Sequence, residues 1–404
     1  MAKIAFMIDI EEGHLLPTFS FARSLVTTGH EIVYMAFPDS EELILKAGFS
    51  YYPLFDKYYP RGFKDEYKRI SMDDEHRGFD RHFNDFVNGA FHRTLVDVDA
   101  DAFVVSCFFS IEMLFMYYSF GLKPIILSPR LYGPHANLCD MCVAEIFSLP
   151  AEASVLLLDA VRKNNPVCSS FRDIVAPISG FIHFVLCSRE FEIDSCISNQ
   201  NTFFIGSGCC AIGYTDFVPE VPDGAKVIYA SMGSQSHAYG AKSRTLLLKL
   251  LNLMKNDELS GFQLVFSTGG NDAMLHGLEI DMPNVRVVEW VDQRLVLQNS
   301  TVAFVHGGLN SVKECIYAGV PMIVVPGSRD QPLNAERVVT RKLGIAIDIE
   351  SISEDDLMAV VFRILNDSSF KSNVLGMRDK FVELDNMELG VSILDKLVRI
   401  KGSN

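Results

Sequence analysis

The chain has 404 residues, 49% hydrophobic and 22% charged, and is therefore long enough for two domains with buried cores. Its 36 Lys and Arg against 51 Asp and Glu give a formal net charge of -15, spread along the sequence. A surface of this sign repels nucleic acid and anionic lipid, which excludes both as default partners. A small anionic ligand is still allowed, because backbone N–H groups at a helix N-terminus can hold it locally.

No targeting or membrane segment is expected. The N-terminal apolar run is broken by Asp9, and no small-residue cleavage site follows it. The apolar stretch from Phe103 contains Glu112 and predicts a strand followed by a helix rather than a membrane span. Nine cysteines without framework spacing, including the solitary pair Cys139 and Cys142, favour reduced thiols over disulfides or a metal site. We expect a cytoplasmic protein.

Strands and helices alternate in the first part of the chain. A helix is predicted over residues 13–28, with Pro17 in its first turn and Gly29 as its stop, and another over residues 40–48. Residues 56–95 break this alternation with a charged and aromatic segment. Apolar runs predict strands at residues 3–8, 31–37, 51–55, 102–108 and 124–129.

A second alternating series begins near Lys226, and its strands end in the loops MGS, STGG and HGG. The Gly- and Pro-rich residues 206–224 between the two series predict a linker. Alternation of this kind indicates α/β architecture, with parallel sheets covered on both faces. We expect two doubly wound, Rossmann-like domains facing each other across a cleft. The predicted parts are an N-terminal domain at 1–205, a C-terminal domain at 225–380, and a C-terminal helix at 381–404 returning to the N-terminal domain.

The stretch FVHGGLNSVKE at residues 304–314 predicts a phosphate site. His306 ends an apolar strand, and Gly307 and Gly308 let the backbone come close to a ligand. Asn310 and Ser311 stand at the start of the following helix, whose unpaired N–H groups and dipole favour an anion. The alternative is purely structural: the glycines turn the chain, and Asn310 or Ser311 caps the helix.

The flanking motifs extend this prediction. VEWVDQ precedes the stretch, and GVPMIVVPGSRDQPLN follows it. In this order and spacing the sequence resembles the donor-binding region of family-1 nucleotide-sugar glycosyltransferases of the GT-B fold, including bacterial natural-product enzymes. In layout the resemblance covers nearly the whole chain. It implies that residues 1–205 form an acceptor-binding domain and residues 225–380 a donor-binding domain.

The resemblance implies a role for each matching residue. Trp290 stacks under the base, and the Val291 backbone contacts its edge. Gln293 and Glu314 reach the ribose, while Asp330 and Gln331 grip sugar hydroxyls. The donor diphosphate and its surroundings involve Gly233, Ser234, Thr268, His306, Gly308, Asn310 and Ser311. The leaving group is stabilised by His306 and helix N–H groups, so neither a metal nor another cofactor is expected.

The first half supplies the expected base. His14 follows the first strand in the family's G-H-x-x-P context, and the resemblance makes it the general base. The structural alternative is that His14 caps the helix near Pro17. The family orients this His with an Asp after a later strand, where this chain has Ser106 and Cys107. Asp9 or Glu112 is a candidate substitute. The alternatives are an acceptor hydroxyl of low pKa, which needs less help from a base, or another role for His14.

The expected activity is inverting transfer of a sugar from a UDP- or TDP-sugar to a hydroxyl, or another nucleophile, of a small hydrophobic acceptor. Cys107, Phe79 and Phe83 are predicted to contact that acceptor. The alternative for the aromatic residues of 56–95 is that they pack beneath a solvent-covering helical insertion. The alternative is a non-catalytic nucleotide-sugar-binding homologue that acts as partner or regulator of another enzyme. A monomer is the default expectation from the self-contained two-domain layout.

Overall fold

The computed structural model describes residues 1–64, 81–132, 138–165, 167–193, 200–209, 217–234, 236–239 and 241–401. Phe79 and the central part of the expected linker lie outside these ranges. The chain forms two compact units. The first comprises Met1–Cys187, Asp194–Cys210 and Leu384–Asn404, and the second comprises Ser188–Ile193 and Ala211–Glu383.

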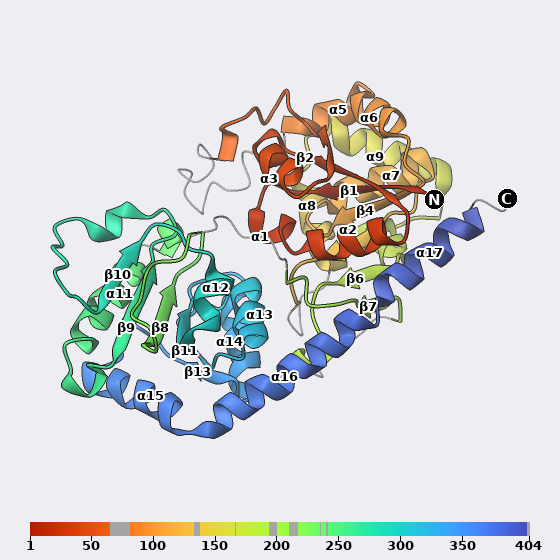
Figure 1. The fold of residues 1–404 in the computed structure, drawn as a ribbon. Helices are drawn as coiled ribbons and strands as arrows, with labels where there is room; N and C mark the ends of the chain where they lie inside the picture. Colours follow the sequence, from red (N-terminus) through yellow and green to blue (C-terminus); the bar gives the residue numbers. More distant parts are fainter. Residues whose placement is uncertain are drawn as a thin grey trace. The chain divides into compact units, whose positions relative to one another are not determined.

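A seven-stranded sheet forms the centre of the first unit, and all its strand pairs are parallel (Figure 1). Most of its strands are apolar and buried, as expected when helices cover both faces. Its order is β3-β2-β1-β4-β5-β6-β7. The strands are β1 (Lys3–Ile8), β2 (Glu31–Ala36), β3 (Ser50–Pro53), β4 (Ala102–Ser106), β5 (Ile125–Ser128), β6 (His183–Val185) and β7 (Thr202–Phe204).

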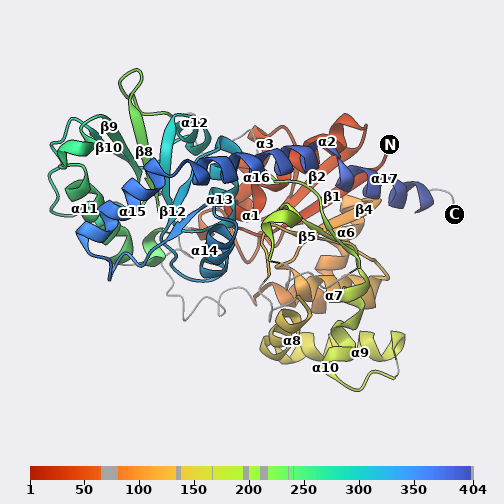
Figure 2. The same ribbon diagram turned by 90° about the horizontal axis from the view of Figure 1, so that it is seen from below.

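Helices cover both faces of this sheet. On one face, α7 to α10 pack together, as Figure 2 shows, over a core that includes Met7 and Val105. On the other face, the Phe6 ring lies 5.9 Å from the Phe21 ring of α2, and α17 packs beside α2. The helices of this unit are α1 (Glu12–Leu15), α2 (Thr18–Thr27), α3 (Glu41–Lys46), α5 (Asn84–Val87), α6 (Ala90–Val98), α7 (Ser110–Phe120), α8 (Leu138–Ser148), α9 (Ala151–Asn164), α10 (Phe171–Val175) and α17 (Leu389–Lys401).

The helix predicted over residues 13–28 is divided. A short α1 ends at Leu15, and α2 starts after Pro17, which is its N-cap. Proline has no N–H to donate, so a new helix starts more easily there than the old one continues. The division leaves His14 in a short helix of its own, directly after β1.

The second unit has a six-stranded parallel sheet, ordered β10-β9-β8-β11-β12-β13. In both sheets the first strand is central and the order reverses beside it, which is the Rossmann arrangement. Two parallel-sheet domains of Rossmann type are thus confirmed. The strands are β8 (Lys226–Ser231), β9 (Phe262–Ser267), β10 (Val285–Val288), β11 (Ser300–Val305), β12 (Met322–Val324) and β13 (Gly344–Ala346). The helices are α11 (Ala241–Leu253), α12 (Gln293–Gln298), α13 (Leu309–Ala318), α14 (Gln331–Thr340), α15 (Glu354–Asn366) and α16 (Ser368–Asn386).

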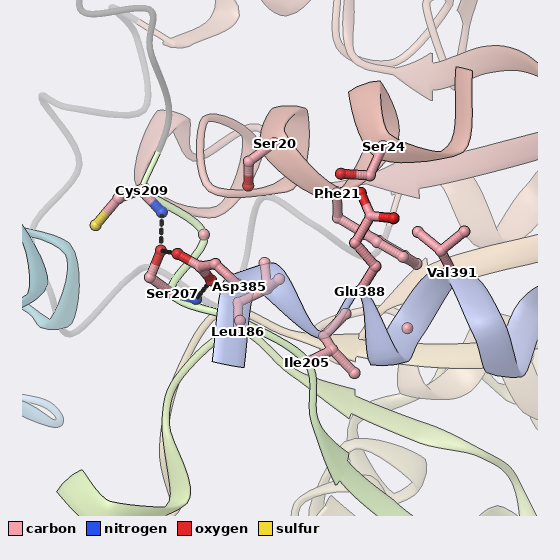
Figure 3. A pocket seen from close by; sticks show the side chains of 13 residues that line it. Ser20, Phe21, Ser24, Leu186, Ile205, Ser207, Cys209, Asp385, Glu388 and Val391 are labelled. Atoms are coloured by element: carbon pink, nitrogen blue, oxygen red, sulfur yellow. Dashed lines mark hydrogen bonds between the residues drawn. The ribbon is translucent and has the colours of Figure 1, made fainter. Parts of the chain in front are cut away.

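The first unit is built from separate segments, and Asp385 joins two of them. Its carboxylate accepts hydrogen bonds from the Ser207 backbone N–H at 2.6 Å and the Ser207 hydroxyl at 2.9 Å (Figure 3). A side chain at Gly206 would put its Cβ 2.6 Å from the Asp385 carboxylate, so glycine is required there. These contacts border a cavity of about 140 Å³ beside α2.

Candidate functional site

His14 and Asp9 form a hydrogen-bonded pair at the carboxyl edge of the first sheet. Met7 of β1 pairs with Val105 of β4, so the residues that follow these strands come together. The His14 Nδ1 lies 2.6 Å from Asp9 Oδ1, and the His14 ring stacks on Phe108 at 4.1 Å with an interplanar angle of 11°. The imidazole is therefore held in both position and plane.

Asp9 is itself fixed from two sides. The Ser106 hydroxyl donates to Asp9 Oδ2 at 2.7 Å, and the Glu11 N–H donates to Asp9 Oδ1 at 3.1 Å. Burial by itself raises the pKa of Asp9, but the charge of His14 and the hydrogen bonds from His14, Ser106 and Glu11 lower it overall. An ionised Asp9 accepts the Nδ1–H of His14 and so leaves the lone pair of the neutral ring on Nε2.

This geometry decides between the two candidate substitutes for the family's Asp. Glu112 lies elsewhere: its Oε1 is 2.6 Å from Nε2 of His82, and the other ring nitrogen of His82 is 2.9 Å from the Tyr59 hydroxyl. Glu112 is thus paired with His82 in a buried network, whereas the carboxylate paired with His14 is that of Asp9. Ser106, at the place where the family carries Asp, supports Asp9 instead of replacing it.

The residues predicted to contact the acceptor have different environments. Cys107 is fully buried, with its Sγ 3.5 Å from the Ser128 hydroxyl oxygen, and burial raises the pKa of its thiol. Phe83 is half-buried, and its ring centre lies 4.4 Å from that of His82. Phe79 lies outside the described residues. An acceptor role for all three stays a prediction.

The second unit brings three predicted loops to one sheet edge. Ser231, which ends β8, is aligned with Ser267 of β9 and with Val305 of β11. The residues that follow these strand ends are therefore neighbours. They are Gly233 and Ser234 after β8, Thr268 after β9, and His306 after β11.

Two glycines make room for the His306 ring. A Cβ added to Gly308 would lie 2.3 Å from His306 Nε2, and one added to Gly233 would lie 2.5 Å from its Cε1. Gly307 has φ 88°, which only glycine adopts without strain. Gly308 is the N-cap of α13 and no side chain caps this helix, so Asn310 and Ser311 are not its caps. The glycines are therefore required by the position of the His306 ring and by the backbone conformation before α13.

Several buried polar atoms at this edge have no hydrogen-bond partner. They are Nδ1 of His306, Oγ1 of Thr268 and Oγ of Ser328. Burial lowers the pKa of His306 to about 4, although Asp330 opposes this, so the ring is neutral at pH 7 and donates from one nitrogen only. Unsatisfied buried donors and acceptors are unusual, and a ligand with many oxygens would satisfy them.

The predicted ribose-binding pair is already in contact. The amide of Gln293 donates to the Glu314 carboxylate, and the Tyr229 hydroxyl donates to the Gln293 Oε1 at 2.9 Å. Burial raises the pKa of Glu314 to about 7, despite the opposing hydrogen bond from Gln293. Trp290 is half-buried and flanked by Gly270, whose added Cβ would lie 3.4 Å from the indole, while Val291 next to it is buried.

Gln331 is engaged within the protein. Its Oε1 accepts from the N–H groups of Gly327 at 2.8 Å and Ser328 at 3.3 Å, and its amide donates to the Tyr239 hydroxyl. Asp330 Oδ2 accepts from Asn334 at 3.0 Å. Direct contacts of Asp330 and Gln331 with a sugar stay a prediction. Tyr239 was missed from sequence, because the loop after β8 has no fixed spacing that singles it out.

Within the described ranges, no group of three or more His, Cys, Asp or Glu residues could hold a metal ion. Among the same residues, none of the helices is both long and apolar enough to cross a membrane.

Comparisons with known proteins agree with this architecture. Residues 278–394 match the family model described as UDP-glucoronosyl and UDP-glucosyl transferase. The uncharacterized UDP-glucosyltransferase YdhE of Bacillus subtilis (strain 168) is 31% identical over 225 residues, which is 55% of this chain and 54% of that protein. This chain thus spans about half the length of that relative.

Solved structures match over almost the entire chain. The glycotransferase of kitacinnamycin has a TM-score of 0.75 at 22% identity and covers 98% of both chains. Glycosyltransferase VinC in complex with DTDP has a TM-score of 0.66 at 16% identity and covers 100% of both. At these identities the likeness establishes the fold, which is the GT-B fold of these neighbours. The expected resemblance to family 1 is also confirmed.

Proposed function

We propose that this chain, whose residues 278–394 match the UDP-glucosyl transferase family, is an inverting glycosyltransferase that uses a UDP- or TDP-sugar. The observation that carries the catalytic assignment is the Asp9–His14 pair, with its 2.6 Å hydrogen bond. A protein that only binds nucleotide-sugars has no use for a histidine fixed by a carboxylate, a serine and a stacked ring. The proposed acceptor is a small hydrophobic molecule, and the proposed protein is a cytoplasmic monomer without a nucleic-acid partner.

The proposed reaction is a single displacement. Nε2 of His14 takes the proton of the acceptor hydroxyl, and the oxygen attacks the anomeric carbon as its bond to the diphosphate breaks. Attack opposite the leaving group inverts the anomeric configuration. Asp9 stabilises the imidazolium that forms. The diphosphate takes up the negative charge, and the first-turn N–H groups of α13 and the neutral His306 donate to it.

The donor class rests on the second unit. The half-buried Trp290 offers a surface for base stacking, and the Gln293–Glu314 pair offers acceptors for ribose hydroxyls. The Bacillus relative is named a UDP-glucosyltransferase, and VinC was solved with DTDP. Both nucleotides are therefore included in the proposal.

The non-catalytic alternative loses its main support. It relied on the missing carboxylate after β4, and Asp9 supplies a carboxylate from β1 instead. Donor hydrolysis measured without any acceptor separates the two: an enzyme releases free sugar slowly, whereas a pure binding protein releases none.

The catalytic assignment is tested by replacing His14 and Asp9 and by moving the carboxylate from position 9 to position 106. His14→Ala is expected to abolish transfer while UDP or TDP still binds. Asp9→Asn is expected to lower kcat by about 10²- to 10⁴-fold, because the ring loses its fixed tautomer and its charge partner. It also shifts the acid limb of the rate profile to lower pH, since an imidazolium without a nearby carboxylate loses its proton more easily.

The double variant Asp9→Ser with Ser106→Asp restores the family's arrangement and is expected to recover part of the lost rate. Ser106→Ala is the matched control: it removes one hydrogen bond to Asp9 but keeps the pair, so its loss is expected to be small. Transfer at the wild-type rate by His14→Ala would refute the mechanism.

A further inference from the structure

Arg130 lies at the same sheet edge as the proposed base. It follows β5, whose neighbour β4 leads into the loop that carries Phe108. The Arg130 guanidinium lies over the Phe108 ring, 5.6 Å from its centre, and the same ring stacks on His14 at 4.1 Å. Arg130 and His14 thus share one aromatic neighbour.

The guanidinium is enclosed, and the described residues give it no acidic partner. Arg130 is half-buried, and its Nε is shut off from water without a hydrogen-bond partner. A second ring, that of Tyr132, lies 5.1 Å from the guanidinium. No carboxylate of the described residues lies within ion-pair distance of Arg130, although the chain has 51 Asp and Glu. An arginine is always charged, and a partly desolvated charge favours an anionic partner.

The backbone of Arg130 is held in place beforehand. The Ser128 hydroxyl donates to the Arg130 carbonyl at 2.9 Å and also reaches the buried Cys107. The Tyr132 ring is edge-on to His183, whose Nε2 is buried and unpartnered. A cation flanked by two aromatic rings, with an unpartnered Nε, has the composition of a binding site for an anionic planar molecule.

We propose that Arg130 binds a carboxylate of the acceptor, so that the preferred acceptors are planar aromatic molecules with both a hydroxyl and a carboxylate. The proposal deepens the proposed function and rests on it. The guanidinium forms two parallel hydrogen bonds to the carboxylate, while the acceptor hydroxyl is delivered to His14. Acceptor choice is then set by charge in addition to apolar contact.

The test uses para-coumaric acid and its methyl ester, which differ only in the carboxylate. The acid is expected to have a KM about 10- to 100-fold below that of the ester for transfer to the phenol, with UDP-glucose and TDP-glucose as donors. Arg130→Met is expected to raise the KM of the acid to that of the ester and leave the ester unchanged. Arg130→Lys keeps part of the preference, because an ammonium cannot form the paired hydrogen bonds. Arg172→Met is the control, since Arg172 is exposed and its ion pair with Asp140 is long, at 3.9 Å.

Binding of both probes is measured in parallel by saturation-transfer NMR, which needs no donor. The proposal is overturned if wild-type protein treats acid and ester alike, if it binds neither, or if Arg130→Met weakens both equally. If neither UDP nor TDP binds, the glycosyltransferase assignment fails. The comparison of acid with ester in binding still decides the role of Arg130.

Discussion

Two half-buried residues of the second unit, Glu314 and His306, are expected to exchange protons when a nucleotide diphosphate binds. Burial raises the pKa of Glu314 to about 7, and ribose hydroxyls that donate to it favour the charged form. Binding therefore lowers this pKa and releases protons near pH 7. Burial lowers the pKa of His306 to about 4, and a bound diphosphate favours the imidazolium. Binding raises this pKa, so the protein takes up protons near pH 5, where the affinity increases as the pH falls.

Calorimetric titration with UDP in buffers of different ionisation enthalpy measures both effects. The apparent enthalpy should depend on the buffer with opposite signs at about pH 7 and about pH 5. Glu314→Gln should abolish the release near pH 7 and leave the uptake near pH 5. An enthalpy that is the same in every buffer at both pH values would contradict the assignment of these residues to the ligand.

At the residue scale, the sequence allowed prediction of those site residues that lie in short motifs with a fixed spacing. His14 and the HGG stretch were predicted because their motifs lie within a few residues along the chain. Asp9 could only be offered beside Glu112, because the choice depends on which carboxylate faces His14 in space. The contacts of Gln331 with Gly327 and Tyr239 could not be anticipated either, since they join two loops far apart in sequence.

At the scale of elements, α14 connects a distant segment to the HGG turn. Arg337 is completely buried, and its Nε donates to Glu192 at 2.6 Å. One helical turn earlier, Asn334 accepts from Arg337 at 3.2 Å and donates to the Gly307 carbonyl at 2.9 Å. The final Asn of the donor motif thus holds the turn against α14, which explains its presence in structural terms.

Glu192→Ala should therefore destabilise the second unit and weaken UDP binding. It leaves the Arg337 charge buried without its partner, which typically costs about 3–5 kcal/mol in the free energy of unfolding. Arg378→Met is the matched control, because Arg378 and Asp379 are partly exposed and 3.7 Å apart, and loss of such a pair costs about 0–1 kcal/mol. Urea unfolding of both variants tests this. Equal midpoints for the two variants would show that the buried pair has no special weight.

The element order was largely predictable, because buried parallel strands appear in the sequence as apolar runs separated by segments with a helical pattern. The division of the first helix at Pro17 was not, although proline at a helix start was recognised. A proline is compatible both with the first turn of a long helix and with the start of a new one. Tertiary contacts decide between these, and here His14 pairs with Asp9 just before the break.

At the scale of the whole molecule, the net charge of -15 repels a diphosphate. The proposed diphosphate site, His306 with the first-turn N–H groups of α13, does not offset this with a charged histidine at pH 7. Binding then depends on short-range donors, whereas the repulsion acts over the Debye length, which shrinks from about 10 Å at 0.1 M salt to about 3 Å at 1 M. UDP affinity should consequently stay constant or increase as NaCl is raised over this range. A site built from Lys and Arg behaves in the opposite way, because salt screens its attraction. Calorimetry across a salt series measures the slope. A steep loss of affinity would mean that cations outside the predicted set hold the diphosphate, and that His306 and the α13 N–H groups are secondary to them.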